Sequence, residues 1–427
     1  GYCNGGESFS LCDPNEVWIY EIIDKGDEKG AVWVARRVPE GYVCGHANQA
    51  RITTFPQESG KWQKARGRGL HKAISSKHLD YIDEPEVECV YSDDVVSFAR
   101  KQGWYSGRDA DFSFADMYNP LTFSGARACD ARVYAMFNRV CPDMKRYEAY
   151  AMGDLAAERL PLWIKPDHKI SLLEVMGLMR DHFEGTPMDM TTDIGAGGSH
   201  SPYRWRPMEF QWDGKTYVNE RAIATQQTGF WFVAQARGWL PDEAGALLWF
   251  GCDDAATSYL TPVYVNTKKV PDCLREGNGD LLHYSATSQF WMCNRVANAC
   301  YKMYNHMAPV AREAADRFEL DQQDNAVPAL DARLSKLLQK GRVRKARKLL
   351  TKFTVSTAQK QFKDWVKLEE LLLVKFIDGN VKAQDEKGAF KHTEYSDGIP
   401  DGLTQPGYTD RWKAAVARDN GDILEVK

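Results

Sequence analysis

The chain has 427 residues, of which 43% are hydrophobic and 12% aromatic, and it carries 55 Lys and Arg residues against 59 Asp and Glu residues. This length allows a large core and two or three domains, and the apolar content excludes a globally disordered chain. The near balance of charge excludes a protein whose whole surface binds polyanions. No apolar run approaches the roughly 18 residues of a membrane-spanning helix, so we expect a globular protein with no membrane partner.

The first hundred residues have the pattern of β structure. Hydrophobic and aromatic residues dominate residues 17–22 and 31–38, and the polar run 24–30 separates them. This arrangement predicts a β-hairpin. A third strand is predicted within residues 41–52, and a loop rich in glycine and charge then extends from residue 56 to about residue 80.

The middle of the chain mixes helices and strands. Ser171, with Glu174 three residues later, forms a capping box, and apolar residues recur at helical spacing as far as Phe183. We therefore predict an amphipathic helix there, followed by a loop rich in glycine and aromatic residues. Beyond the loop we expect a hairpin at 211–218, buried strands at 229–236 and 246–252, and a helix that begins near Ser288.

The composition changes in the last quarter of the chain. Residues 329–371 hold 12 Lys and Arg residues against 4 Asp and Glu residues, so the rest of the chain has a net charge of −12, from 43 basic and 55 acidic residues. Apolar residues occur at helical spacing between the cations. Such a segment can dock an acidic partner or nucleic acid. A solvated helix pair packed on an acidic body is the commoner explanation, so nucleic acid is not an expected partner.

Neither the cysteines nor the acidic clusters predict a metal centre. The ten cysteines are scattered without a C-x-x-C pair, which argues against a zinc ribbon, and several lie in apolar runs typical of buried thiols. Asp181, His182 and Glu184 are metal-ligand residue types, but adjacent helical residues point in different directions. Asp253 and Asp254 could form an acid–base pair, although we expect them to cap the next helix.

Polar residues at the ends of apolar segments are the candidate site residues. Asn48, near Arg51, follows the third predicted strand, where a side-chain amide can donate to an oxyanion. Arg127 and Arg132 lie beside a predicted helix start, where a guanidinium can bind a carboxylate through two hydrogen bonds. Gln226 lies at the start of a buried strand. Each also has a structural explanation: a turn for the asparagine, salt bridges for the arginines and backbone hydrogen bonds for the glutamine.

Five stretches of the chain are long motifs that can be compared with known families. They are GESFSLCDPNEVWIYEI, VWVARRVPEGYVCGHANQARI, MRDHFEGTPMDMTTDIGAG, SPYRWRPM and NERAIATQQTGFWFVAQARGWLP. In these stretches the chain resembles the cysteine dipeptidases of the N-terminal-nucleophile (Ntn) hydrolase superfamily, the dipeptidase-A group, which is related to the secernins. The resemblance runs from Gly5 to about Met307 and resumes weakly in GYTDRWKAAVARDNGD. The basic segment from about Pro328 to Glu370 is not part of it.

The resemblance implies an α+β protein with a four-layer αββα sandwich that hydrolyses dipeptides without a metal or other cofactor. In this family an N-terminal cysteine, exposed by removal of a leader, attacks the scissile carbonyl while its own α-amine relays the proton. An amine with a pKa near 8 suits a thiol with a pKa near 8.5. We expect residues 1–310 to form the hydrolase domain and residues 311–427 to form a mostly helical, basic extension that packs on it.

The resemblance also implies roles for individual residues. Asn48 matches the family's asparagine on the oxyanion side, and Arg132 matches the arginine that holds the active-site network. These two residues are the catalytic candidates. Arg127 is the weaker match to the family's arginine, and we assign it, with Gln226, to substrate binding.

The resemblance further implies that the catalytic cysteine is not in this chain. Residue 1 is Gly, and GYCNGGESFS resembles an interior strand region of the family. Neither Cys3 nor Cys12 is expected to replace the nucleophile, and Cys44, two residues before His46, is expected to be a buried structural thiol. We therefore expect the parent protein to be a cysteine-type dipeptidase, a hydrolase of the protease class active in proteolysis. We expect this chain alone to be inactive.

Two interpretations remain open. In the first, the protein is a dipeptidase whose N-terminal part was removed, is disordered or exists as a separate chain. In the second, the dipeptidase fold serves as a non-catalytic scaffold or structural interaction protein. The expected partners are dipeptide substrates together with a second copy of the chain or a separate chain with the N-terminal part. No compartment is assigned.

Overall fold

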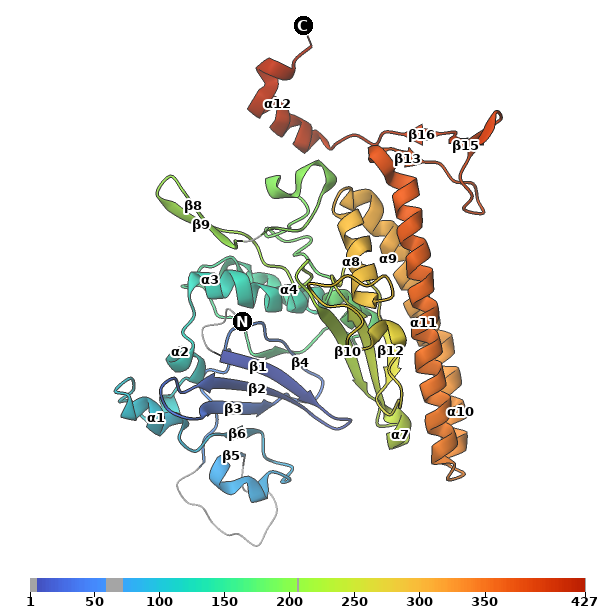
Figure 1. Cartoon of the computed structure of the whole chain (residues 1–427). Coiled ribbons are helices and arrows are strands. Elements are labelled where there is room, and N and C mark those ends of the chain that lie inside the picture. Colours follow the sequence, from blue (N-terminus) through green and yellow to red (C-terminus); the bar gives the residue numbers. More distant parts are fainter. Residues whose placement is uncertain (1–5, 59–71, 206, 427) are drawn as a thin grey trace. The chain divides into compact units, whose positions relative to one another are not determined.

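The computed structural model describes residues 6–58, 72–205 and 207–426. The chain divides into two compact units: Gly1–Leu178 with Met208–Arg221, and Met179–Pro207 with Ala222–Lys427 (Figure 1). Both units combine helices with antiparallel strand pairs, so the chain has the expected α+β character. Within the described ranges, every helix is too short or too polar to cross a bilayer.

A five-stranded sheet, in the order β1-β2-β3-β6-β5, forms most of the β structure of the first unit. β5 and β6 are parallel, and the other neighbouring strands are antiparallel. Ile19, Val32 and Val34 are fully buried on one face of this sheet and share a core with Phe98 and Phe112. The strands are β1 Gly6–Cys12, β2 Val17–Asp24, β3 Ala31–Arg37, β5 Ala73–Ser75 and β6 Cys89–Tyr91.

Short helices and two small strand pairs complete the first unit. A π-helical turn, Ala126–Asp130, leads directly into helix α4, Ala131–Val140. The strand pairs are β4 Val43–Cys44 with β7 Trp163–Ile164, and β8 Glu209–Trp212 with β9 Lys215–Val218. The remaining helices are α1 Val95–Lys101, α2 Phe114–Tyr118, α3 Phe123–Gly125, α5 Glu148–Ala151 and α6 Leu172–Leu178.

A three-stranded sheet, β10-β11-β12, and a group of long helices form the second unit (Figure 1). The 34-residue helix α11 packs along α8 and β12. Its buried residues Ala358, Trp365 and Leu372 join the same core as Val296 of α8. The elements are β10 Phe230–Ala236, α7 Asp242–Gly245, β11 Ala246–Cys252, β12 Thr261–Tyr264, α8 Gln289–Cys300, α9 Tyr304–Asp321, α10 Val327–Leu338 and α11 Val343–Phe376.

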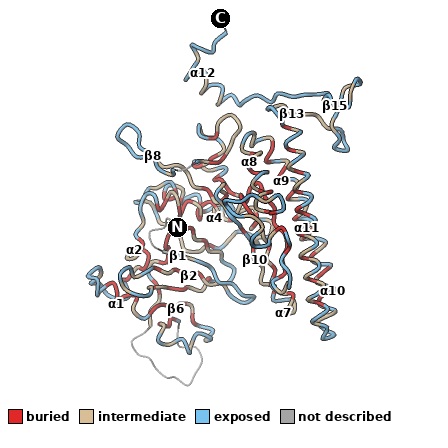
Figure 2. Tube along the Cα trace, in the orientation of Figure 1, coloured by how far each residue is buried: buried red, intermediate tan, exposed pale blue. Residues whose placement is uncertain are grey.

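The C-terminal part of the second unit is exposed. Strands β13 Val381–Lys382, β14 His392–Thr393, β15 Ser396–Pro400 and β16 Leu403–Thr404 and helix α12 Asp410–Leu424 contain no buried residue among those described (Figure 2). One close contact attaches this segment to the glycine-rich loop. A Cβ atom built on Gly198 would lie 2.2 Å from Cδ1 of Tyr408 and 2.9 Å from Cδ1 of Trp412. The absence of a side chain at residue 198 therefore allows the C-terminal segment to pack there.

Several elements predicted from the sequence are confirmed. The hairpin of residues 17–22 and 31–38 is the β2–β3 pair, and the hairpin at 211–218 is the β8–β9 pair. The capping box is present, because the Ser171 N–H donates to Glu174 Oε2 at 2.7 Å and the Glu174 N–H donates to Ser171 Oγ at 3.2 Å. The helix near Ser288 is α8, and the basic segment forms α10 and α11.

The prediction of a third strand within residues 41–52 is wrong for most of these residues. Only Val43 and Cys44 form a strand. A buried carboxylate takes the hydrogen bonds that a neighbouring strand would supply: Glu21 accepts the backbone N–H groups of Arg51 and Ile52. The loop predicted at 56–80 also contains β5 and a 3₁₀ helix, Ser76–Tyr81, while its residues 59–71 lie outside the described part of the chain.

The amphipathic helix predicted to reach Phe183 ends at Leu178. Asp181 Oδ1 accepts the backbone N–H of Phe183 at 2.7 Å, and Phe183 has a φ of 65°. Short aspartate side chains compete with the helix for backbone donors in this way. Phe183 is buried in an irregular turn after the helix. Its apolar side chain therefore extended the helical spacing in the sequence beyond the true end of the helix.

The strand predicted at 229–236 is not buried on both faces. Phe230 and Phe232 are 61% and 48% exposed, whereas Trp231 and Val233 between them are 4% and 8% exposed. Alternate residues of a strand point to opposite faces of its sheet. One face of β10 therefore joins the core, and the other presents a row of aromatic rings in which Phe230 also stacks on Phe250, with centroids 5.9 Å apart.

Candidate active site

The loop that carries Asn48 is held by side chains that replace strand pairing. Asn48 has a φ of 60°, a left-handed conformation that asparagine adopts more readily than most residues. The side chain of Gln49 donates to the Asn119 carbonyl at 2.7 Å, and Asn119 Oδ1 accepts the Ala50 N–H at 2.8 Å. Together with Glu21, which accepts the N–H of Arg51 at 2.6 Å, these bonds fix the residues directly after Asn48.

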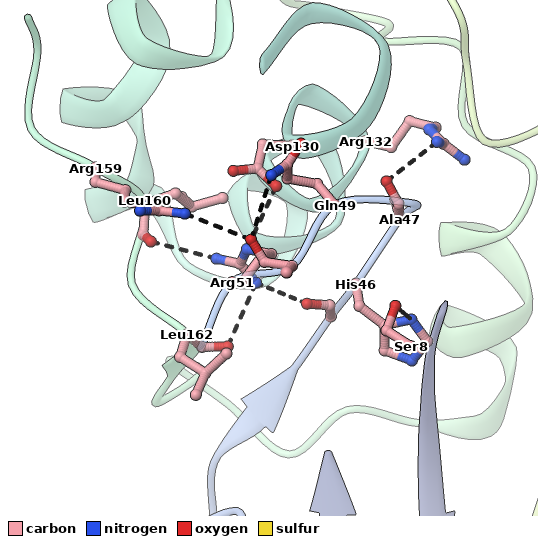
Figure 3. Close-up of polar contacts among 12 residues, drawn as sticks. Ser8, His46, Ala47, Gln49, Arg51, Asp130, Arg132, Arg159, Leu160 and Leu162 are labelled. Carbon is pink, nitrogen blue, oxygen red and sulfur yellow. Dashed lines mark hydrogen bonds and ion pairs between the residues drawn. The ribbon is translucent and has the colours of Figure 1, made fainter. Parts of the chain in front are cut away.

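Arg51 connects this loop to the rest of the first unit (Figure 3). Its guanidinium donates to the carbonyl groups of Gly45 and Pro161, each at 2.6 Å, and its Nε lies 3.5 Å from a carboxylate oxygen of Asp130. The Arg51 and Asp130 side chains are each 1% exposed. Tyr150 donates its hydroxyl proton to the same carboxylate at 2.6 Å. A buried ion pair with this many hydrogen bonds can fix the relative positions of the segments that carry it.

The two predicted catalytic residues contact one another. Arg132 Nη2 donates to Asn48 Oδ1 at 2.8 Å, and Arg132 Nε donates to the Ala128 carbonyl at 2.9 Å. Arg132 Nη2 also donates to the Ala47 carbonyl at 3.3 Å (Figure 3). Arg132 belongs to the first turn of α4, directly after the π-helical turn. The guanidinium therefore binds the oxygen of the Asn48 amide and orients the amide nitrogen away from itself.

The two predicted substrate-binding residues lie in different units. Arg127, in the π-helical turn, forms an ion pair with Glu220 and donates to the Met152 carbonyl at 3.3 Å. Gln226 belongs to the second unit, where its Nε2 donates to the Arg204 carbonyl at 2.6 Å. Both side chains thus have the structural partners that the sequence also allowed, so their role in substrate binding stays a prediction.

A histidine and two serines lie close to the loop of Asn48. The sequence indicated the histidine only as a neighbour of Cys44, and it did not indicate the serines. Ser8 Oγ is 2.9 Å from His46 Nδ1, and Ser10 Oγ is 3.2 Å from His46 Nε2. Burial, followed by the charge of Arg51, lowers the pKa of His46 to about 4, so the ring is neutral at pH 7. Burial raises the pKa of the Cys44 thiol as well. Cys44, which is partly buried, and His46 therefore do not form an ionised thiolate–imidazolium pair.

Glu21 is another residue that the sequence did not indicate. Burial raises the pKa of its carboxyl to about 7, even though two backbone N–H groups and the charge of Arg51 favour the ionised form. The available signal was an acidic residue with apolar neighbours on both sides in the strand VWIYEIID. A charged residue at the buried position of a strand usually has a specific partner.

The acidic clusters considered as alternative sites have structural partners. Within the described ranges, no group of three or more His, Cys, Asp or Glu side chains could hold a metal ion. The expectation that Asp253 and Asp254 cap a helix is wrong, because a turn follows them. Asp254 accepts hydrogen bonds from the Tyr203 hydroxyl, from Thr257 Oγ1 at 2.9 Å and from the Ala256 N–H at 3.2 Å. The aspartate stabilises the turn through these bonds.

A cavity of about 720 Å³ lies within the second unit. Residues of α8, α9, the C-terminal end of α11 and the segment before α12 line it, including Lys302, His306 and Tyr408. None of the four predicted site residues is among those that line this cavity.

Comparison with known proteins gives both a family match and similar proteins. The model of Peptidase family C69 matches residues 1–317. A probable dipeptidase of Salmonella dublin is 23% identical over 262 residues, which are 61% of this chain and 47% of that protein. A dipeptidase of Bifidobacterium longum is 22% identical over 302 residues, which are 70% of this chain and 47% of that protein. The chain thus spans about half the length of the curated relatives it matches.

Proposed function

Because the chain belongs to peptidase family C69, we propose that it is part of a cysteine-type dipeptidase. The observation that carries this proposal is the hydrogen bond of 2.8 Å from Arg132 to Asn48. The two residues are 84 positions apart in the sequence. Their contact supports the catalytic roles that the family resemblance implies for them.

In the proposed reaction, a cysteine thiolate attacks the carbonyl carbon of the dipeptide. The α-amine of the same cysteine takes the thiol proton and delivers it to the leaving nitrogen, and the C–N bond breaks. This step releases the C-terminal amino acid and leaves the N-terminal one as a thioester. A water molecule, deprotonated by the same amine, then hydrolyses the thioester and restores the thiol.

Asn48 stabilises the oxyanion in this proposal. Its amide oxygen accepts from Arg132, so its NH₂ group is the part that can donate to the developing negative charge. Arg132 positions Asn48 and adds a positive charge nearby. Arg127 would exchange Glu220 for the carboxylate of the dipeptide. Gln226 keeps its predicted role in substrate binding. Asn48 and Arg132 are thus the two residues on which activity should depend most strongly.

The nucleophile in this proposal is not one of the nine cysteines that the structure describes. A reactive cysteine needs a lowered thiol pKa, whereas burial raises it at nearly all of these positions. The thiols with raised pKa values are those of Cys12, Cys44, Cys89, Cys129, Cys252, Cys273, Cys293 and Cys300. The proposed nucleophile is the N-terminal cysteine that the family resemblance implies, and it is none of these nine.

The fold proposed for the complete protein is the four-layer αββα sandwich of the family resemblance. Residues 1–310 would form the hydrolase domain, and residues 311–427 would form a helical extension on it. The match of the family model to residues 1–317 supports this division, because it ends close to the proposed boundary.

The test uses the natural form of the protein, whose N-terminus and intact mass are measured first. We expect it to hydrolyse dipeptides, and we expect iodoacetamide to inactivate it by labelling a cysteine that is not among the nine described. Asn48→Ala should lower kcat by about 10²–10³-fold, the usual effect of losing one oxyanion donor. The matched control Asn420→Ala, in the exposed helix α12, should leave kcat unchanged. A natural form without turnover would favour the non-catalytic scaffold instead.

A further inference from the structure

The cations of residues 333–348 form a surface that the proposed function does not use. This segment, here called the basic hairpin, comprises the second half of α10, the turn at Gly341 and the start of α11. It has eight cations and no Asp or Glu. Seven of the cations are exposed and Arg347 is partly buried. They are Arg333, Lys336, Lys340, Arg342, Arg344, Lys345, Arg347 and Lys348.

The eight cations form no ion pair with any residue in the described ranges. Carboxylates elsewhere on α10 and α11 bind other cations. Asp331 pairs with Arg237 at 2.8 Å, and Glu369 pairs with Arg295 at 2.7 Å. The acidic residues of the two helices thus leave the positive charge of the basic hairpin unneutralised.

The location of these cations is unfavourable for the helix itself. α11 begins at Val343 with no acidic residue in its first turn, and Arg344, Lys345 and Lys348 lie within its first two turns. The N-terminus of a helix is the positive end of its dipole, where cations are destabilising and anions are stabilising. An external anionic surface would therefore relieve repulsion that the chain does not relieve by itself.

The backbone of the basic hairpin is held in place by packing. Leu334 of α10 and Ala346 and Leu350 of α11 are fully buried. Residues four positions apart lie on the same face of a helix, so Arg344 and Lys348 are neighbours on the exposed side. The family match ends at residue 317, before this segment begins. The exposed cations are thus a fixed feature outside the part of the chain that the family model matches.

The same chain carries an exposed acidic counterpart in its first unit. Residues 80–88, here called the acidic loop, contain five carboxylates and no cation. Asp80, Asp83 and Glu86 are exposed, and within the described part of the chain none of the five forms an ion pair. Two cations near the acidic loop pair with carboxylates outside it: Lys77 pairs with Asp93 at 3.0 Å, and Arg37, which also donates to the Pro85 carbonyl of the acidic loop, pairs with Glu16 at 3.3 Å.

We propose that the basic hairpin of one copy of this chain docks on the acidic loop of a second copy. Two such contacts related by a twofold axis would use the same two surfaces in each copy and would close the dimer. Clustered opposite charges of this kind steer association and make it sensitive to salt. The partner is therefore a second copy of the chain, and the two surfaces are complementary in charge.

Nucleic acid fits the basic hairpin less well. Residues 333–348 contain no aromatic side chain on which a base could stack. The rest of the chain, with its charge of −12 outside residues 329–371, would also repel a phosphate backbone that extends beyond the basic hairpin. A second copy avoids this repulsion because its own basic hairpin is available to the acidic loop of the first.

The test measures the molecular mass of the 427-residue chain by analytical ultracentrifugation at low and high sodium chloride concentration. The Debye length falls from about 30 Å at 0.01 M salt to about 3 Å at 1 M, so a dimer should form at low salt and dissociate at high salt. Two charge-reversed variants then test the basic hairpin and the acidic loop one at a time. In the hairpin variant, Lys336, Lys340, Arg342, Arg344, Lys345 and Lys348 become Glu, and in the loop variant Asp80, Asp83 and Glu86 become Lys.

These substitutions change the basic hairpin from +8 to −4 and the acidic loop from −5 to +1, counted from the residues present. Each variant alone should be monomeric, with a dissociation constant raised about tenfold or more. An equimolar mixture should restore the dimer, because each surface then meets the opposite charge. Misfolded variants could not produce this rescue. A control with exposed cations reversed outside the basic hairpin, at Lys387, Lys391, Arg411 and Arg418, should dimerise like the wild type.

Two results would overturn the proposal. The first is a wild-type chain that is monomeric at low salt over the whole concentration range. The second is a mixture of the two variants that fails to restore the dimer. A monomeric wild type that instead binds a single-stranded oligonucleotide through Arg344 and Lys348 would assign the basic hairpin to nucleic acid. Because dimerisation is measured without substrate, its failure is distinguishable from failure of the proposed dipeptidase function.

Discussion

The carboxylate of Asp130 lies 3.5 Å from Nε of Arg51, and both side chains are almost completely buried. Arg51 is three residues after Asn48, and Asp130 is two residues before Arg132. The ion pair thus joins the loop and the helix whose side chains form the hydrogen bond of the candidate site. Loss of this buried ion pair should therefore displace both catalytic candidates, Asn48 and Arg132.

Arg51→Met should destabilise the fold strongly. The substitution leaves the Asp130 carboxylate buried without its counter-ion, and breaking a buried pair in this way costs about 3–5 kcal/mol. Urea unfolding, followed by circular dichroism, measures the change in the free energy of unfolding. Arg108→Met is the control, because Arg108 pairs with Asp111 on the surface. Equal losses in the two variants would contradict the structural role of Arg51.

Glu21 should make the stability depend on pH. The pKa of its carboxyl is about 7 in the folded protein and near 4.5 in an unfolded chain, so the folded state binds more protons between these values. The stabilising contribution is complete below pH 4.5 and is lost as the pH rises through 7. Glu21→Gln should remove this loss, which is on the order of 3 kcal/mol. Urea midpoints between pH 5 and 8 test this, and parallel curves for wild type and variant would refute it.

Arg132→Lys should lower kcat in the natural, complete protein by about tenfold or more, with a smaller effect on KM. Lysine keeps the charge but cannot contact Asn48, Ala47 and Ala128 together, as the guanidinium does. Steady-state kinetics with a dipeptide measures both constants. Arg418→Lys, on the exposed face of α12, is the matched control. A change in KM alone would assign Arg132 to substrate binding.

The 427-residue chain by itself should release no free amino acids from dipeptides. Its buried thiols have raised pKa values, so they remain protonated near pH 7 and are poor nucleophiles. Chromatographic detection of the free amino acids after incubation with a dipeptide mixture tests this. Turnover by the purified chain, abolished by iodoacetamide, would identify a nucleophile within it and would refute the proposal that the nucleophile lies elsewhere.

Gly198→Ala should detach the C-terminal segment from the glycine-rich loop. The new methyl group would lie 2.2 Å from Tyr408, closer than any van der Waals contact, so the ring and helix α12 must move. Limited proteolysis should then cut residues 405–424 faster than in the wild type. Gly177→Ala is the control, because no atom lies within 4 Å of its added Cβ. Unchanged proteolysis of the Gly198 variant would show that the contact does not hold the segment.

Features that depend on neighbouring residues could be predicted from the sequence. The two hairpins, the capping box of Ser171 and Glu174 and the helix at Ser288 follow from local patterns, and the structure has them. The pairing of Asn48 with Arg132 was expected from family resemblance. Composition alone did not distinguish either residue from an ordinary turn or salt bridge.

Features that depend on long-range contacts could not be predicted. Residues 45–52 look like a strand, but Glu21, thirty positions earlier, binds their backbone and holds them as a loop. The neutral state of His46 depends on its burial between Ser8 and Ser10, which are 38 and 36 positions away. No local pattern encodes these distances, because tertiary packing determines which polar side chains meet.

The exposed aromatic row on β10 has a practical consequence for choosing a salt. Phe230 and Phe232 form an exposed apolar surface. Two copies of the chain should associate through it more strongly as salts such as sulfate are added, because these salts favour burial of apolar surface. Screening by the same ions weakens contacts between charges. In sulfate, a dimer held by the basic hairpin and the acidic loop would therefore give way to a dimer held by the aromatic row of β10. The two dimers have the same mass. Sodium chloride, or a Phe232→Ser background, keeps the two modes of association apart.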